Sequence, residues 1–200
     1  MKKLVTVFAI IIAIGTSAFA ADANADKSVY KVDTNASKVY WTGKKVTGEH
    51  TGYINLSDGE VHVKDEKVVG AQIKIDVQSI EVTDLSGEWK DKLVGHLKSD
   101  DFFSAEKHPV ATFAIKTVDA TDKGYQVVGD LTIKGITKQV AFPAEVKVDG
   151  SSVSATGTAT IDRTEYDIRY GSGKFFSDLG DNMINDNFEI TFELKATAAN

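Results

Sequence analysis

The sequence has no cysteine, no run of basic residues and no apolar segment long enough to cross a membrane. Without cysteine the protein can form no disulfide, carries no thiol nucleophile and offers no thiol for a lipid anchor, so its core alone must hold the fold together. The formal net charge is −6 at pH 7. Because proteins that bind phosphates need a basic face, nucleic acid is excluded as an expected partner.

Motifs for metal binding and for hydrolysis are also missing. The four histidines lack ligand spacing, and no H-E-x-x-H sequence occurs. We therefore expect no metal site and no cofactor. No G-x-S-x-G sequence is present either, which argues against a serine nucleophile on a strand-to-helix turn.

The N-terminus has the pattern of a signal peptide. Lys2 and Lys3 precede an apolar run at 4–14, and Ala18-Phe19-Ala20 forms a small-x-small cleavage site. The run is too short to span a bilayer, so we expect cleavage near Ala20 and no stable membrane anchor. We predict a signal peptide at 1–20, a flexible leader at 21–28 and a single domain at 29–197, in a periplasmic or secreted protein.

Alternating apolar and polar residues dominate the predicted domain. Residues 71–77 and 188–194 place apolar side chains on one face and polar side chains on the other, which is typical of strands with one buried face. Candidate strands occur at 29–33, 37–43, 47–56, 60–64, 67–77, 110–119, 125–134, 138–149, 152–161 and 187–197, with turns at Asp58-Gly59, Lys123-Gly124, Lys134-Gly135 and Asp149-Gly150. Because consecutive hairpins make an antiparallel sheet and closure removes exposed edges, we predict an all-β fold, an extended antiparallel β-barrel of about eight strands.

One segment has the period of a helix instead. Leu85, Trp89, Leu93 and Leu97 recur every four residues, which predicts one short amphipathic helix. Its apolar face must be buried, and we expect the helix to lie across one open end of the barrel. Residues 164–185 show no sustained period and are predicted to form a long, ordered and functional loop.

The strand at 152–161 has unusually small residues on one face. Val153, Ala155, Gly157, Ala159 and Ile161 share that face. If they point inward, this strand contributes little volume to an interior that must be densely packed. Either a ligand or a neighbouring ring, such as that of Phe113 or Phe192, must fill the space, and both alternatives stay open.

Two motifs resemble the YceI-like family of exported proteins. They are "GDLTIKGITKQVAFP" at 129–143 and "HLKSDDFFSAEKHPVATF" at 96–113, and the resemblance extends from about Val29 to Leu194. It implies a lipocalin-like barrel whose lumen binds a long isoprenoid or similar lipid. A long chain can be bound by burial alone, since each methylene transferred from water contributes about 0.8 kcal/mol.

The inward parity of the strands and this resemblance together predict an apolar, ligand-binding lumen. We expect it to be lined by Trp89, Leu93, Phe103, Phe113, Ile115, Leu131, Phe142, Ala155, Ala159, Phe175, Phe176, Phe188 and Phe192. The predicted function is to hold a long apolar chain for sequestration, storage or transport. The expected partner is the lipid, and a homodimer is left open.

Two other functions compete with lipid binding. The first is a barrel enzyme that acts on a small apolar substrate through Asp162, Glu165, Asp167 and Arg169, because paired carboxylates can transfer protons and an arginine can bind an anion. We favour the interpretation of these residues as solvated loop charges or ion pairs at the rim. The second is a filled barrel that serves only as an interaction module, which would have no continuous cavity.

Overall fold

The computed structural model describes residues 27–199, so the expected signal peptide and residues 21–26 of the expected leader lie outside the described residues. The first strand begins at Ser28, inside the range assigned to the leader. The elements are β1 (Ser28–Val32), β2 (Lys38–Lys45), β3 (Gly48–Lys64), β4 (Lys67–Val82), α1 (Gly87–Lys98), β5 (Val110–Thr121), β6 (Gly124–Ile133), β7 (Ile136–Asp149), β8 (Ser152–Asp162), the 3-10 turns η1 (Arg163–Tyr166) and η2 (Gly180–Asn182), and β9 (Ile184–Ala198).

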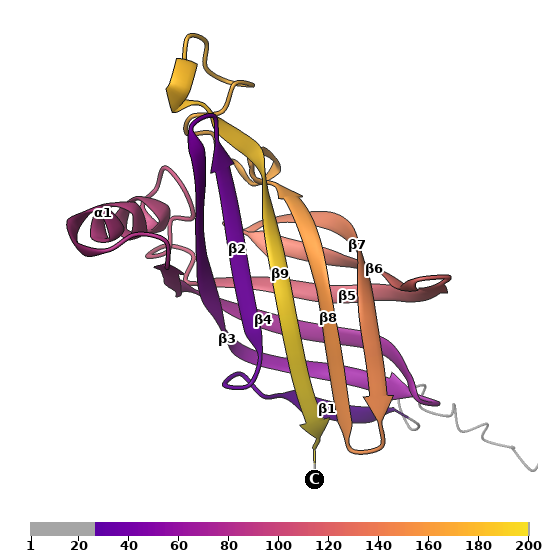
Figure 1. Cartoon of the computed structure of the whole chain (residues 1–200). Helices are drawn as coiled ribbons and strands as arrows, with labels where there is room; N and C mark the ends of the chain where they lie inside the picture. The colour runs from indigo at the N-terminus through magenta and orange to yellow at the C-terminus, as the bar shows by residue number, and fades with distance from the viewer. Residues whose placement is uncertain (1–26, 200) are drawn as a thin grey trace, which may run out of the picture.

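The strands close into an antiparallel barrel (Figure 1). From β3 the hydrogen-bonded order runs through β2, β9, β8, β7, β6, β5 and β4, and β4 pairs with β3 again. Lys134 and Gly135 both have positive φ (51° and 75°) in the tight turn between β6 and β7, as a two-residue type I′ hairpin requires. The predicted all-β, lipocalin-like barrel is confirmed.

Strands β1 and β2 together occupy one position in this barrel. Both lie between β3 and β9: Lys31 pairs with Glu60 and Val39 with Ile54, while Val32 pairs with Ala196. The chain between them, residues 33–37, forms a short turn. The nine strands of the described residues therefore make an eight-membered barrel, because two of them lie end to end.

The turn predicted at Asp58-Gly59 is wrong, because β3 continues through it. The register between β3 and β4 shifts between Leu56 and Asp58 instead, which marks a bulge. A Cβ at position 59 would lie 2.7 Å from a side-chain carbon of Val32. Glycine is needed at position 59 because β1 approaches closely there. In the sequence, an Asp-Gly pair at such a site looks the same as an Asp-Gly turn.

The helix forms where the sequence predicts it, but it does not lie across the barrel end. It packs beside β4, on the outside of the barrel (Figure 1). Only Leu97, in its last turn, is buried, and the helix is followed by Phe102 and Phe103, which reach the interior. The helix as a whole was expected to cover one end of the barrel. The apolar side chains there come instead from the helix C-terminus and the residues after it.

Candidate functional site

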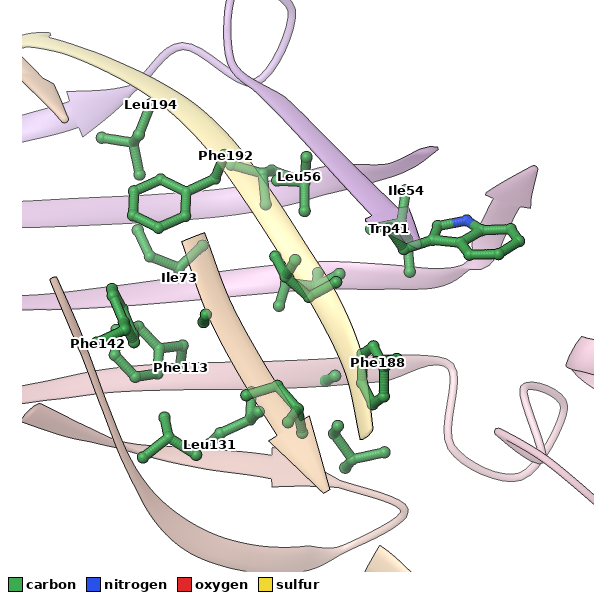
Figure 2. A pocket seen from close by; sticks show the side chains of 18 of the residues that line it. Trp41, Ile54, Leu56, Ile73, Phe113, Leu131, Phe142, Phe188, Phe192 and Leu194 are labelled. Atoms are coloured by element: carbon green, nitrogen blue, oxygen red, sulfur yellow. The ribbon is translucent and has the colours of Figure 1, made fainter. Parts of the chain in front are cut away.

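The barrel encloses a continuous cavity with a volume of about 260 Å³ (Figure 2). One water molecule needs about 10–15 Å³, and apolar cavities of about 150 Å³ stay dry and take up guests of the size of benzene. The wall of this cavity is almost entirely carbon. Its size and polarity therefore suit an apolar guest larger than benzene.

Nine of the predicted lumen residues lie on the wall of this cavity. Several of them are only half-buried within the barrel, because their side chains border the open space. Contact of these side chains with a ligand stays a prediction. The nine residues are Phe103, Phe113, Ile115, Leu131, Phe142, Ala155, Ala159, Phe188 and Phe192.

Four other predicted residues do not line the cavity, and their placement in the lumen is wrong. Trp89 is 72% exposed and stacks under the Lys92 ammonium group, 5.0 Å from the ring centre. Leu93 packs against the core from the helix and does not reach the cavity. Phe175 and Phe176 are 45% and 50% exposed on the long loop. The helical period is confirmed, but Trp89 and the two loop rings lie on the outer surface.

Two rings lie directly on glycines of the barrel wall. A Cβ at Gly157 would lie 2.8 Å from the Cζ atom of Phe192, and a Cβ at Gly129 would lie 2.5 Å from that of Phe113. The small residues of β8 are thus partly explained by a ring that fills their space. A cavity nevertheless remains, and Ala155 and Ala159 form part of its wall. The neighbouring ring is therefore confirmed, and a ligand beside it stays a prediction.

Trp41 is a cavity residue that the prediction omitted, although it shares an alternating run with Val39 and Gly43. Its ring would lie 2.7 Å from a Cβ at Gly52, and its Nε1 donates a hydrogen bond to the Glu81 carbonyl oxygen at 3.1 Å. The indole N–H is therefore satisfied by the backbone. The parity of β2 was the signal that could have identified this residue.

Arg163 is one of two charged residues that border the cavity, the other being Glu193, and it is only 4% exposed. Its guanidinium donates hydrogen bonds to the carbonyl oxygens of Ile168 (2.8 Å), Ile184 (3.0 Å) and Asn185 (2.9 Å). Asp186 lies 3.9 Å away. Burial lowers the pKa of Arg163, and the nearby carboxylates oppose this shift. These hydrogen bonds thus connect the two ends of the long loop at 164–185.

Tyr166 packs beneath this loop and is 1% exposed. Burial, followed by the charge of Glu165, raises the pKa of Tyr166 to about 12. The hydroxyl group has no hydrogen-bond partner among the described residues. The phenol is therefore neutral at physiological pH and acts as a core residue of the loop.

The charged residues proposed for an enzyme do not face the cavity. Partial burial alone would raise the pKa of Asp162, but hydrogen bonds from Lys174 (2.6 Å) and Thr164 outweigh it and lower the pKa. Arg169 pairs with Asp167 at 2.6 Å on the exposed surface. Asp162 and Arg169 thus form separate ion pairs, the first with Lys174 and the second with Asp167.

Residues 27–199 contain no group of three or more histidine, aspartate or glutamate side chains placed to hold a metal ion. Within the same residues, no helix has the length and apolar character needed to cross a membrane.

A closed antiparallel barrel around a carbon-lined cavity defines the class of lipocalin-like proteins. Within that class, the chain belongs to the YceI-like family, whose domain matches residues 30–196. A UPF0312 protein from Staphylococcus aureus (strain USA300) is 42% identical over 82 residues, which cover 38% of this chain and 46% of the relative. A UPF0312 protein from strain N315 of the same species gives the same values. The chain thus spans about half the length of the curated relatives it matches.

Solved structures share the fold over most of the chain. BcnA from Burkholderia cenocepacia is 28% identical with a TM-score of 0.66, and the match covers 83% of this chain and 99% of BcnA. A polyisoprenoid-binding domain from Saccharophagus degradans is 18% identical with a TM-score of 0.57, covering 85% and 98%. The Campylobacter jejuni YCEI protein is 21% identical with a TM-score of 0.53, covering 74% and 85%.

Proposed function

We propose that this protein is exported and holds an isoprenoid-like or other long apolar chain in the barrel lumen, for sequestration, storage or transport. The observation that carries this proposal is the continuous cavity with an almost purely carbon wall. Polar groups inside a ligand would lose their hydrogen bonds there. A hydrocarbon chain loses none and gains about 0.8 kcal/mol for each buried methylene.

The comparisons support the same ligand class. The structure from Saccharophagus degradans is described as a polyisoprenoid-binding domain and has the same fold. The enzyme alternative finds no support in the geometry, because Asp162, Glu165, Asp167 and Arg169 lie away from the cavity wall. We infer that the lipid is the ligand, that no cofactor takes part and that binding is the whole activity.

Native mass spectrometry of gently purified protein tests the proposal. We expect a co-purifying lipid, or uptake of added polyprenyl alcohols by protein freed of lipid. Ala159→Phe places a ring in the lumen and should abolish uptake, whereas Thr160→Phe, the next residue on the outer face of β8, should not. A lipid-free spectrum together with no uptake of any polyprenyl alcohol would sink the proposal.

Export has its own test. In a bacterium that expresses the full sequence, we expect the mature protein outside the cytoplasm, with its N-terminus near Ala21. The intact mass and the cell fraction are the measurements. A full-length protein that stays in the cytoplasm would contradict export without affecting the proposal for the lumen.

A further inference from the structure

Strands β4 and β5 stop pairing with each other before either strand ends. Their register goes no further than Gln72 and Ala114, although both strands continue, over residues 67–71 and 115–121. Figure 1 shows the two strands diverging toward the β5–β6 turn. Between residues 67–71 and 115–121 the described part of the wall has no backbone ladder. We call this place the β4–β5 seam.

A bulge bends each of the two strands at this seam. In β4 the register against β3 shifts between His62 and Val63, which leaves Val69 as the extra residue. In β5 the register against β6 shifts between Ile115 and Thr117. A bulge bends its strand, increases the local twist and often ends pairing. The divergence of β4 and β5 therefore follows from the way each strand pairs with its other neighbour.

Cavity residues lie on both sides of the seam. Val68 and Ala71 line the lumen from β4, and Ile115 and Val118 line it from β5. Ala71 is buried, and the other three are half-buried. Because no ladder joins the strands here, the backbone groups that face the seam must take their hydrogen bonds from water. The wall at the seam thus depends on the packing of apolar side chains and not on hydrogen bonds between strands.

Strands β7 and β8 form a second place of this kind, but it is covered. Their register ends at Ala144 and Gly157, before either strand ends. The 3-10 turn η1 packs against β7. Tyr166 and Ile168, at the end of this turn and just after it, are 1% and 0% exposed. The long loop therefore closes the wall where β7 and β8 separate.

The β4–β5 seam has no such cover from a helix of residues 27–199. Helix α1 packs beside β4, but at the opposite end of that strand, where Lys90 pairs with Glu81 at 2.6 Å (Figure 1). The turn η1 packs against β7 and β9. Residues 67–71 and 115–121 therefore separate the lumen from the outside without a second layer.

Hydrogen bonds hold the barrel together at its two ends. At one end the buried Arg163 donates to three carbonyl oxygens of the long loop and β9. At the other end the Tyr30 hydroxyl donates a hydrogen bond to the Gly150 carbonyl oxygen at 2.6 Å, which ties β1 to the β7–β8 turn. One rival opening lies near Arg163, where residues of β9 line both the cavity and a shallow polar pocket on the outside. These residues are Ile184, Asn185 and Asn187.

We propose that the ligand enters and leaves the lumen sideways, through the β4–β5 seam. Parting the seam breaks no hydrogen bond between the two strands, whereas parting paired strands leaves donors and acceptors that must be satisfied anew. Local opening favours such places with few hydrogen bonds. An apolar chain that passes between Val68 and Val118 then contacts carbon on both sides. This inference rests on the proposed lipid binding.

A reversible bridge across the seam tests this route, because the protein has no cysteine of its own. Val69 is 42% exposed, Thr117 is exposed, and the two would face each other if the ladder continued. The double variant Val69→Cys/Thr117→Cys is bridged with dithio-bismaleimidoethane, which a reductant cleaves. Uptake of the apolar dye N-phenyl-1-naphthylamine is followed by stopped-flow fluorescence. The bridge should slow uptake about tenfold or more, and cleavage should restore the rate. Affinity at equilibrium should not change, because the bridge alters the path and not the end states.

The same bridge across the rival opening is the matched control. Val46 and Gly173 both lie next to Met183: the Val46 N–H donates a hydrogen bond to the Met183 carbonyl oxygen at 3.2 Å, and a Cβ at Gly173 would lie 3.2 Å from the Met183 Sδ atom. The bridged variant Val46→Cys/Gly173→Cys should take up the dye at the unmodified rate. An unchanged rate with the seam bridged, or slower uptake with the control bridge alone, would overturn the proposal.

A single bulky label serves where the seam cysteines do not join. A polyethylene glycol maleimide on Thr117→Cys should slow dye uptake, whereas the same label on Ser154→Cys should not, because Ser154 is exposed on β8 and paired on both sides, with Lys147 and Lys195. Equal rates for the two labelled proteins would also overturn the proposal.

The dye separates failure of this route from failure of the proposed function, because it reports entry into an apolar lumen whatever the natural ligand is. Farnesol and solanesol are added as competitors. Dye uptake that the seam bridge slows, without competition from either alcohol, would refute the proposed function and keep the route. Competition by the alcohols, at rates that the seam bridge leaves unchanged, would refute the route alone.

Discussion

Arg163→Ala should be among the most destabilising single substitutions at the barrel rim. The change leaves three carbonyl oxygens without their donor and removes one of the two cations near Asp186, of which the other is Lys174. Hydrogen bonds to charged groups contribute about 1.5–3 kcal/mol each and are not additive. Asp186 is 23% exposed and keeps Lys174 as a partner, so the lost ion pair adds little to this cost. We expect a loss of about 3–5 kcal/mol in the free energy of unfolding.

Urea unfolding followed by tryptophan fluorescence measures this loss, because Trp41 is buried in the barrel. Thermal unfolding is the second measurement: a domain of this size loses about 2–4 °C in melting temperature per kcal/mol, so the melting temperature should fall by roughly 6–20 °C. Arg163→Lys keeps the charge but cannot span three carbonyls, so it should recover only part of the loss.

Arg169→Ala is the matched control, since Arg169 lies on the same loop but pairs with Asp167 on the exposed surface. Exposed ion pairs contribute about 0–1 kcal/mol. If the losses in the free energy of unfolding for Arg163→Ala and Arg169→Ala differ by less than about 1 kcal/mol, Arg163 does not hold the ends of the loop together.

Three further predictions use urea unfolding as the common assay. Gly157→Ala should destabilise by about 1–3 kcal/mol, because its Cβ would meet the Phe192 ring; an unchanged midpoint would contradict the close packing. Gly95→Ala should stabilise by up to about 1 kcal/mol, because the helix position is open and alanine is the better helix former; destabilisation would show a contact that the structure lacks. Asp162 has a lowered pKa in the fold, helped by Lys174. Its contribution is therefore present above the unfolded pKa of about 4 and is lost as pH falls through the folded pKa. The stability difference between the native protein and Asp162→Asn should shrink from about pH 7 to about pH 2.5, and a constant difference would argue against the shift.

The strands and their inward faces follow from period-two alternation, because side-chain direction in a strand depends only on position along the chain. Phe113 and Phe192 could be placed on the cavity wall for this reason. The same rule could have placed Trp41 there. Alternation does not show which residue each side chain packs against. The packing of the two rings on glycines could therefore be seen only in the structure.

The errors fall on segments whose packing depends on tertiary contacts. Trp89 has the correct helical spacing, yet the spacing does not say how much of the helix reaches the barrel. Phe175 and Phe176 were expected to touch a guest at the barrel mouth, but both lie about half exposed. Arg163 and Tyr166 anchor the loop instead. A buried arginine that bonds to backbone carbonyls leaves no pattern in the sequence, since its partners are main-chain atoms.

The seam formed by β1 and β2 joins the beginning of the domain to its end. Tyr30 pairs with Ala198 and Val39 with Phe192, so the barrel cannot close until the last strand is available. Contacts of such long sequence separation form late and make folding slow. The chain must therefore be complete before the lumen exists, which means that any lipid enters only after the last strand has been made and has paired.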